Sequence, residues 1–586
     1  MIKLLKHMKK KEWIMAGICM VLVLGQVYFE LTMPDYMSDL TVMVQTPGYA
    51  QSEVWDVGLR MLGCALAAMA LTIIGGWFSA QVAAGFSYSI RSEVFEKISN
   101  FGKEEMDRFS VPSLVIRTTN DIRQVQMLLA MGLQILVKAP VMAIWAVIKI
   151  VGKSWELSLL TAICVVILIS AMLTVLFLLL PRFKRVQKLT DDINRIAREN
   201  LNGISVVHAF NAEGYQEKKF KAVNDNLTKI QLFNQHAFAF LSPVMTLAMS
   251  GLSLAIFWFG AYLIENIAMP DVAGRLGLFG DVVVFGTYAT YVVMSLMLIL
   301  MIFMFIPAAQ VSAGRIDELL NTEISIWSGK ENGGIETGTV EFKNVSFRYP
   351  DSSNHVLKNI SFRVKCGDTV AFIGATGSGK TTLVSLIARF YDATDGQVLI
   401  DGRNIREYTF EALYRKIGYV TQKAVMFSGT VRDNVLFGES NAVLSDDNVW
   451  QALQLAQAME FVEKMPGKLD EAIDRGGTNI SGGQKQRLSI ARALARKPEI
   501  LVFDDSFSAL DYKTDAVLRA GLARELKNTT KIIVGQRIGT IRHADKIIVL
   551  EHGEVAGMGT HEELIKNCPV YCEIAKSQLS EQELLA

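Results

Sequence analysis

Six long apolar stretches constrain the fold of this chain more than any other feature. They lie at about residues 13–33, 57–80, 128–151, 157–180, 237–264 and 282–308, and the fourth and fifth contain no charged side chain. A helix needs roughly 20 apolar residues to cross a bilayer, and within the bilayer its backbone polar groups must be satisfied internally. The pattern therefore predicts six membrane-spanning helices and excludes a wholly soluble protein.

The rest of the composition places a soluble part after these helices. Of 586 residues, 51% are hydrophobic and only 20% are charged, a balance that fits a membrane domain joined to a soluble domain. The net charge of +1, with no basic patch, predicts no nucleic-acid partner. The six cysteines form no disulfide framework and are read as reduced thiols.

Charge around the first span predicts its orientation. Five lysines, at positions 3, 6, 9, 10 and 11, precede it, whereas residues 34–56 after it carry four acidic residues and no Lys or Arg. Cytosolic loops are enriched in Lys and Arg. We therefore expect a cytosolic N-terminus, and six spans return the chain to the cytosol.

Two of the connections are long enough to extend the membrane helices into the cytosol. About 45 residues separate spans two and three, and more than 50 separate spans four and five, both with helical apolar spacing. We place the turns at residues 103–109 and 210–216. Each is expected to form a short helix that docks on the soluble domain; the alternative is a solvated charged turn.

Glu30 and Lys138 are ionisable residues within the predicted spans. Such groups usually face a cavity or a partner. Lys138 either lines a translocation path or forms an ion pair or snorkels, and the sequence does not choose between these. Gln26 and His236 are weaker candidates for the path.

Residues 321–338 contain four glycines and are predicted to be a linker. Short strands follow, and the first of them ends at Tyr349. Its ring offers a surface on which adenine can stack, although such a residue can also be a core aromatic at a strand end.

A phosphate loop follows the strand at residues 369–373 and opens an apolar helix. It matches G-x-x-x-x-G-K-[ST] and consists of Gly374, Ala375, Thr376, Gly377, Ser378, Gly379, Lys380, Thr381 and Thr382. Its backbone N–H groups are expected to cradle phosphate, with Lys380 reaching the β- and γ-phosphates and the Thr381 hydroxyl ligating Mg²⁺.

Two further elements extend this chemistry. The apolar run 500–503 predicts a buried parallel strand that presents Asp504 to Mg²⁺ at its carboxyl end, and Gln422 follows another predicted strand and could complete the metal shell. The turn Ser481, Gly482, Gly483 and Gln484 opens a helix and forms a second anion site. One nucleotide needs one phosphate loop, so the second site is expected to serve an ATP held by another copy or a partner.

With these motifs in order, the chain resembles an ATP-binding-cassette half-transporter of the exporter type over nearly its whole length. The resemblance implies an α-helical membrane domain followed by an α/β nucleotide-binding domain, ATP and Mg²⁺ as cofactors, and two cassettes that close over two ATP molecules. It also implies that Tyr349 is the adenine platform, Gln422 the glutamine loop, residues 481–484 the signature, and Asp504 the magnesium aspartate. Expected boundaries are residues 1–320, a linker at 321–338, 339–575 and a tail at 576–586.

Two residues depart from the family pattern. Asp505 stands where the family has the glutamate that acts as general base, and Gln536 stands where it has the switch histidine. Aspartate is shorter by one methylene, and misplacement on that scale can cost on the order of 100-fold in rate. Glutamine cannot supply positive charge to the phosphate. We expect ATP to bind here and to turn over slowly.

The nearly intact signature beside these changes predicts a heterodimer, in which residues 481–484 complete the site of a second half-transporter; a homodimer is the alternative. The chain thus resembles the degenerate-site subunit of bacterial multidrug exporters, located in the cell membrane among lipids and moving amphipathic small molecules. The bacterial origin is inferred from the half-transporter size and the absence of a targeting segment. The alternatives are a lipid or peptide exporter, and an ATP-gated regulator or channel.

Overall fold

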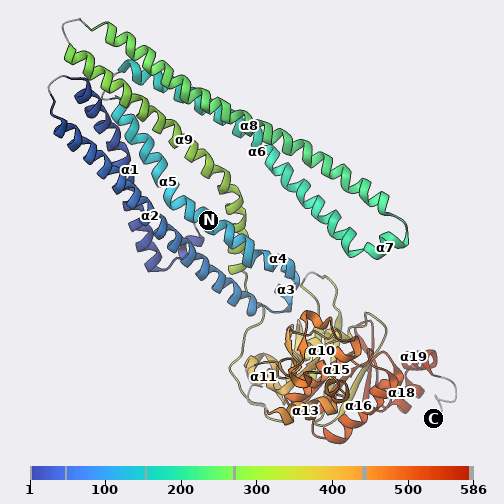
Figure 1. The fold of residues 1–586 in the computed structure, drawn as a ribbon. Coiled ribbons are helices and arrows are strands. Elements are labelled where there is room, and N and C mark those ends of the chain that lie inside the picture. The colour runs from blue at the N-terminus through green and yellow to red at the C-terminus, as the bar shows by residue number, and fades with distance from the viewer. Residues whose placement is uncertain are drawn as a thin grey trace. The chain divides into compact units, whose positions relative to one another are not determined.

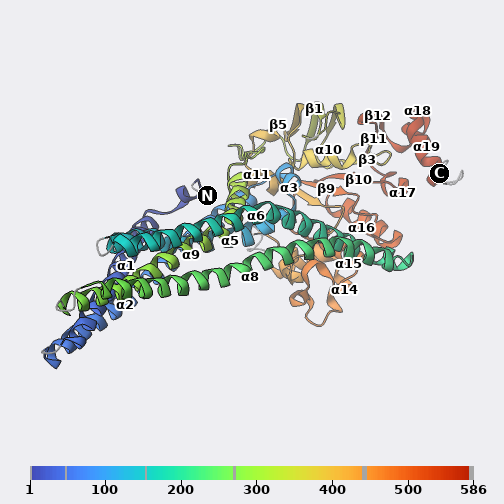
Figure 2. The same cartoon turned by 90° about the horizontal axis from the view of Figure 1, so that it is seen from above.

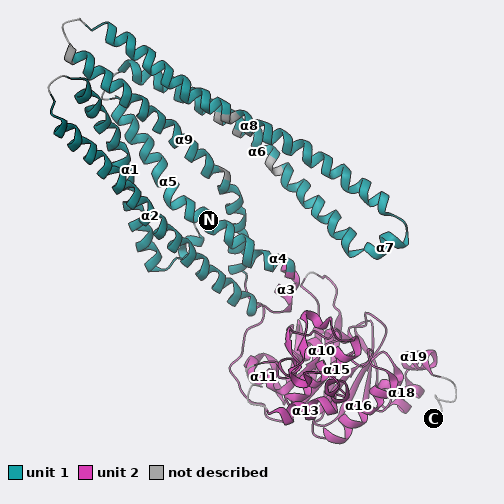
Figure 3. Ribbon diagram, viewed as in Figure 1, with its two compact units in different colours: residues 1–99, 112–322 teal, residues 100–111, 323–586 magenta. Residues whose placement is uncertain are grey.

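The computed structural model describes residues 3–46, 49–151, 155–267, 272–350, 352–438 and 445–579 (Figure 1). The chain forms two compact units (Figure 3). The first comprises residues 1–99 and 112–322, and the second comprises residues 100–111 and 323–586. A short segment near residue 105 therefore belongs with the C-terminal unit.

The first unit is helical. Six of its described helices are long and apolar enough to cross a membrane, which confirms the six predicted spans. Its main helices are α1 (Lys10–Gln45), α2 (Gln51–Ser99), α5 (Ile122–Val151), α6 (Trp155–Asn202), α8 (Glu213–Glu265) and α9 (Val272–Leu320). Shorter elements are η1 (Leu4–His7), α4 (Val111–Ile116), the π-helical η2 (Arg117–Asp121) and α7 (Ile204–Ala209).

Four of these helices continue well beyond their apolar stretches, as predicted for α2, α6 and α8; the extension of α9 was not predicted. The helices α2, α6, α8 and α9 contain 49, 48, 53 and 49 residues. At a rise of about 1.5 Å per residue each is more than about 70 Å long, over twice the hydrocarbon thickness of about 30 Å. Figures 1 and 2 show α6 and α8 side by side, joined by α7, and Figure 1 shows their α7 end diverging from α1, α2, α5 and α9.

The first of the two predicted turns forms the expected helix. It is α3 (Lys103–Phe109), which belongs to the second unit, and the Asp107 carboxylate accepts a hydrogen bond from the Tyr391 hydroxyl at 2.9 Å. The second prediction was misplaced. The short helix is α7, and α8 already begins at Glu213, so only residues 210–212 form the turn. Local polarity at 213–216 suggested a turn, but helical hydrogen bonding continues through it.

The two charged residues within the spans form an ion pair. Lys138 Nζ on α5 lies 2.8 Å from Glu30 Oε1 on α1, and Gln26 Nε2 donates to the same oxygen at 2.7 Å. A second pair joins the same helices, with Lys149 Nζ 2.6 Å from Asp35 Oδ2. The Tyr288 hydroxyl of α9 donates to Asp35 Oδ1 at 2.8 Å. Polar contacts therefore link three of the spans. The predicted candidate His236 instead lines a hollow between α6 and α8.

The second unit is α/β. Its main sheet has the order β12-β11-β3-β10-β9-β6, in which only β12 is antiparallel among the strands described. These strands are β3 (Thr369–Ile373), β6 (Ile417–Val420), β9 (Ile500–Asp504), β10 (Thr530–Val534), β11 (Lys546–Glu551) and β12 (Glu554–Gly559). An antiparallel sheet has the order β2-β1-β4-β5, with β1 (Val340–Phe347), β2 (Leu357–Val364), β4 (Asp395–Ile400) and β5 (Arg403–Asn404). A small sheet pairs β7 (Gly429–Thr430) with β8 (Ala472–Ile473).

The helices of this unit complete its core. They are α10 (Lys380–Ile387), α11 (Phe410–Lys416), α12 (Val431–Val435), α13 (Asp446–Leu455), α14 (Met459–Glu463), α15 (Gly482–Ala495), α16 (Tyr512–Glu525), α17 (Ile538–Ile541), α18 (His561–Asn567) and α19 (Pro569–Gln578). Single-turn helices are η3 (Ile405–Glu407), η5 (Lys468–Asp470) and η6 (Arg475–Gly477). The boundary expected at residue 575 falls inside α19, and residues 580–586 of the expected tail lie outside the described part of the chain.

Both faces of the main sheet are buried. Along β9, Leu501 and Phe503 pack into one hydrophobic cluster, while Ile500 and Val502 pack into another. Alternate side chains of a strand point to opposite faces, so a strand covered on both sides is a continuous apolar run. This explains why an uninterrupted apolar sequence leads to Asp504 at the carboxyl end of the sheet.

The predicted linker is held against the second unit. Within residues 323–338, Gly329 N donates to Tyr408 O and Ile335 N to Asp401 O, at 2.9 and 2.8 Å. A Cβ added to Gly329 would lie 2.1 Å from the carbonyl oxygen of Glu407. Glycine is therefore needed here for close backbone approach.

Candidate functional site

The phosphate loop connects β3 to α10 as predicted. Gly379 caps α10 with φ 99°, a left-handed conformation that favours glycine, and the Lys380 side chain is only 8% exposed. Its Nζ donates to the carbonyl oxygens of Gly374 and Ala375, both at 2.8 Å. The loop therefore folds around the cation that is expected to meet phosphate. Burial lowers the pKa of Lys380, against the opposing effect of Asp505 and Asp504.

Asp504 lies beside the loop at the end of β9. Its two carboxylate oxygens accept hydrogen bonds from the Thr381 and Tyr419 hydroxyls, at 3.1 and 3.2 Å. Burial raises the pKa of Asp504 above its ordinary value, and the nearby Asp505 carboxylate adds to this effect. A buried carboxylate next to a threonine hydroxyl supplies the oxygen ligands that Mg²⁺ prefers, so these residues fit the predicted metal site.

Asp505 and the two predicted glutamines also come together. A single oxygen of Asp505, Oδ2, accepts from Gln536 Nε2 at 2.8 Å and from Gln422 Nε2 at 3.4 Å. Asp505 has φ 49°, a conformation that aspartate tolerates better than most residues. Burial raises the pKa of Asp505. Segments that are 83 and 31 residues from Asp505 therefore meet on one carboxylate.

Tyr349 lies just after β1 and is only partly exposed. Its hydroxyl is 2.9 Å from Thr382 Oγ1, and its ring makes edge-on contacts with Phe347 and Tyr391. These contacts place the ring beside the start of α10, next to the phosphate loop. The ring therefore packs on core aromatics beside the expected nucleotide site. Its role as an adenine platform stays a prediction.

The signature turn opens α15. Ser481 is its N-cap, and a reciprocal pair of bonds links Ser481 N to Gln484 Oε1 at 2.8 Å and Gln484 N to Ser481 Oγ at 3.4 Å. Gly482 and Gly483 form the first turn of the helix. Within the described parts of the chain, Ser481 and Gln484 bond to each other and not to the phosphate-loop cluster. The second anion site at this turn stays a prediction.

The structure brings one residue into the site, and a second against the loop that carries Gln536, that the sequence analysis did not select. The Tyr419 hydroxyl donates to Asp504. Tyr419 is the next-to-last residue of β6, the strand that precedes Gln422, and this proximity to Gln422 in the sequence could have pointed to it. Gln578 contacts the backbone on both sides of Arg537 from the C-terminal helix, and no local pattern points to it.

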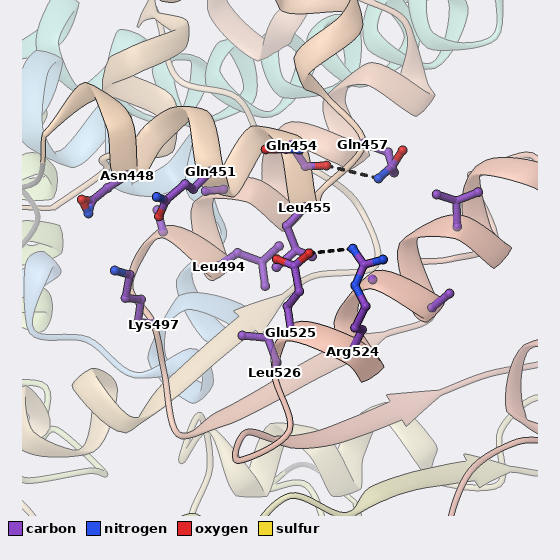
Figure 4. A pocket seen from close by; sticks show the side chains of 15 residues that line it. Asn448, Gln451, Gln454, Leu455, Gln457, Leu494, Lys497, Arg524, Glu525 and Leu526 are labelled. Atoms are coloured by element: carbon purple, nitrogen blue, oxygen red, sulfur yellow. Dashed lines mark hydrogen bonds and ion pairs between the residues drawn. The ribbon is translucent and has the colours of Figure 1, made fainter.

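A separate hollow of about 430 Å³ lies between α13, the end of α15 and α16 (Figure 4). Its walls include Gln451, Leu455 and Leu494, and Arg524 pairs with the adjacent Glu525 at 2.8 Å. None of the predicted site residues lines it. The phosphate-loop cluster is therefore the better candidate for nucleotide chemistry.

Comparison with known families covers both units. Residues 16–296 match the ABC transporter transmembrane region, and residues 357–508 match the ABC transporter family. An uncharacterised ABC transporter ATP-binding protein of Mycobacterium tuberculosis is 38% identical over 551 residues, which are 93% of each chain. One of Bacillus subtilis is 36% identical over 97% of each chain.

Relatives with named activities are also similar. A multidrug resistance ABC transporter ATP-binding and permease protein of Lactococcus lactis is 30% identical over 89% of this chain and 86% of its own. An ATP-dependent lipid A-core flippase of Aromatoleum aromaticum is 29% identical over 88% of this chain and 84% of its own. The structure of a bacterial Atm1-family ABC exporter with ATP bound has the same fold, with a TM-score of 0.79, 23% identity and coverage of 98% and 99%.

These matches agree with the geometry of the two units. The membrane domain has six spanning helices, and the α/β domain brings a phosphate loop, a buried aspartate and a capped signature turn into one fold. The domain binds ATP, and its hydrolysis is coupled to transport. This multi-pass membrane protein therefore belongs to the ABC transporter family, as an exporter half-transporter in which a membrane domain is fused to a nucleotide-binding domain.

Proposed function

We propose that this chain is the degenerate-site subunit of a heterodimeric exporter of amphipathic small molecules. In this arrangement its own site binds ATP and hydrolyses it slowly, while its signature turn completes the site of a different half-transporter. The N-terminus and nucleotide-binding domain face the cytosol, where ATP is available.

The observation that carries this proposal is the state of the Asp505 carboxylate. A general base must reach the proton of an attacking water, and it works best when its free oxygen is in hydrogen-bonding range. Here the shorter aspartate already accepts two amide N–H groups on one oxygen. Neither Gln422 nor Gln536 can carry the positive charge that would stabilise the transferred phosphoryl group. Slow hydrolysis follows from both features.

Each remaining residue has a role that its position supports. Lys380 and the phosphate-loop N–H groups bind and orient the triphosphate, and Tyr349 offers its ring to the adenine. Thr381 and Asp504, with Gln422 beside Asp505, would hold Mg²⁺, which offsets the charge of the phosphates when bound. The domain boundaries predicted at residues 320, 338 and 575 are part of the same proposal.

The signature half supports a role in trans. The reciprocal bonds pair Ser481 N and Gln484 N, and Gly482 and Gly483 begin α15 between them. The N–H groups at the start of a helix favour a phosphate ligand. The diverging α6–α8 pair of the membrane domain also fits assembly with a second half-transporter, since ABC half-transporters act as dimers.

The decisive experiment compares ATP hydrolysis by the purified chain alone with that of the chain co-purified with its partner. The chain alone should bind ATP but hydrolyse it at well below one per second, and the complex should be faster. Turnover of several per second by a homodimer would refute the degenerate assignment. Several per second is close to the median enzyme turnover of about 10 per second, whereas the slow outcome lies well below one per second, so the two are readily separated.

Two variants test the two halves of the site. Asp505→Glu combined with Gln536→His should raise hydrolysis at this site by about 100-fold, from restored positioning of the base. An unchanged rate would show that other groups limit hydrolysis.

Ser481→Arg should abolish hydrolysis by the complex, and survival of activity would show that the signature does not act in trans. Thr560→Arg is the matched control, because Thr560 and Glu563 form the same kind of capping box at α18.

An exporter of lipid is the second candidate, favoured by the similarity to the lipid A-core flippase. Export of fluorescent amphipathic dyes and of a labelled lipid by proteoliposomes holding the complex separates the two. Dye export without lipid movement supports the leading proposal, and lipid movement alone overturns it.

A further inference from the structure

The switch residue Gln536 lies on a loop that leads from β10 into the short helix α17. Gln536 and Arg537 are both exposed, whereas Ile538 is fully buried. The first N–H groups of a helix have no partner within it. The Ile538 N–H is such a group, and α17 has only four residues to hold it in place.

Gln578, at the end of α19, hydrogen-bonds to the backbone of this loop on both sides of Arg537. Its Oε1 accepts from Ile538 N at 2.9 Å, and its Nε2 donates to the carbonyl oxygen of Gln536 at 2.8 Å. One planar amide thus clamps an N–H and a C=O that flank a single residue. The distances are those of good hydrogen bonds.

The helix that carries Gln578 is itself firmly anchored. Tyr571 and Ala575 of α19 are fully buried in the hydrophobic cluster that also contains Ile538 and Ile541 of α17. The Tyr571 hydroxyl lies 2.7 Å from His561 Nδ1 on α18. The amide of Gln578 is therefore presented from a fixed support.

The clamped backbone is the one from which Gln536 reaches the ATP site. Its Nε2 donates to Asp505 Oδ2 at 2.8 Å. Three hydrogen bonds therefore connect α19 to Asp505: two join the Gln578 amide to the loop backbone, and one joins the Gln536 side chain to Asp505. Loss of the first contact frees the exposed loop and loosens the last.

We propose that Gln578 is a positioning residue for the nucleotide site, holding Gln536 where it meets Asp505 and the terminal phosphate of ATP. It acts through Gln536 and does not touch nucleotide itself. Because the readout is binding, the inference holds whether the site hydrolyses ATP slowly or quickly.

The test measures the affinities of the full-length chain for ADP and for the analogue AMP-PNP, both with Mg²⁺. Gln578→Met keeps the length of the side chain and removes both hydrogen bonds. We expect it to weaken AMP-PNP binding by about fivefold, the effect of about one net hydrogen bond, with ADP binding unchanged. Lys576→Met, an exposed position on the same helix, is the matched control and should change neither affinity.

A combination with Gln536→Ala separates positioning from general support. If Gln578 acts through Gln536, Gln578→Met has no further effect on AMP-PNP binding once the Gln536 side chain is gone. Gln578→Glu keeps the oxygen that accepts from Ile538 N. It should therefore bind AMP-PNP more tightly than Gln578→Met does, with ADP binding again unchanged. Equal weakening of ADP and AMP-PNP, or an effect that persists in the Gln536→Ala background, would overturn the proposal.

Discussion

The ion pair between Lys138 and Glu30 gives the sharpest test of the membrane domain. Lys138→Met removes the ammonium group while keeping a long apolar side chain, and it leaves the Glu30 carboxylate with Gln26 as its donor at 2.7 Å. An ionised carboxylate in an apolar environment without its cation is costly. We therefore expect the single variant to be clearly less stable than the wild type.

The structure sets the size of the effect. At 2.8 Å between Nζ and Oε1, with an effective dielectric constant of about 20, the gross attraction is roughly 6 kcal/mol. Desolvation cancels much of this, and breaking a buried pair typically costs about 3–5 kcal/mol. The two side chains here are 24% and 22% exposed, and Gln26 remains bonded, so we expect about 2–3 kcal/mol.

The assay is the fraction of detergent-purified protein that stays monodisperse after heating. A loss of about 2–3 kcal/mol should lower the midpoint by roughly 3–5 °C for a unit of this size. Adding Glu30→Gln should restore most of it, because both charges are then absent. Lys149→Met, with and without Asp35→Asn, is the matched control on the same helices. Its midpoint should fall less than that of Lys138→Met, because the Lys149 and Asp35 side chains are 37% and 33% exposed.

Two results would refute this reasoning: a Lys138→Met variant as stable as the wild type, or a double variant no more stable than the single one. Transport by the stable double variant then decides between the two roles predicted for Lys138. Retained transport shows that the pair is structural, and lost transport with restored stability places the Lys138–Glu30 pair in the translocation path.

Three further predictions concern the nucleotide-binding unit. Ser481→Ala should cost about 1 kcal/mol through loss of the helix cap, as should Thr560→Ala at α18, but only Ser481→Ala should also lower ATP hydrolysis by the complex. Because burial raises the pKa of Asp504 in the folded protein, its protonated form stabilises the fold at pH values below its unfolded pKa of about 3.8, and this stabilisation is lost as pH rises through the folded pKa. Asp504→Asn without Mg²⁺ and nucleotide should therefore raise the unfolding temperature near neutral pH and have no effect at low pH; a gap that widens at low pH would contradict the assignment. Glu105→Ala should uncouple hydrolysis from transport, because Glu105 accepts from Gly102 N and Ser325 N, both at 2.8 Å, and holds α3 against the segment that follows the last span; equal loss of both activities would argue for a general folding defect.

Several features of the fold follow from local sequence alone. Each membrane span is one continuous apolar stretch, and the phosphate loop is a single run of nine residues between a strand and a helix. Such patterns depend on side-chain periodicity and on backbone freedom within a short segment, so they can be recognised without knowledge of the neighbours. The helix at residues 103–109 belongs to the same class.

The displaced second turn shows where local reasoning fails. Residues 213–216 are polar and look like a turn, yet α8 begins at Glu213, because helix boundaries depend on hydrogen bonds and packing that polarity does not encode. The glycines of residues 321–338 likewise predict a linker, and the structure shows part of this segment hydrogen-bonded to the domain that follows.

The sequence by itself determined which chemistry is present: six spans, a phosphate loop, a signature turn, and an aspartate and a glutamine at positions where the family has glutamate and histidine. Only the tertiary structure decided which of these groups meet. Lys138 pairs with Glu30 across 108 residues, two glutamines share one oxygen of Asp505, and Gln578 clamps the loop of Gln536. The physical reason is that hydropathy and turn patterns are properties of short segments, whereas a hydrogen bond between distant residues exists only after strand order and helix packing have brought its two atoms within about 3 Å.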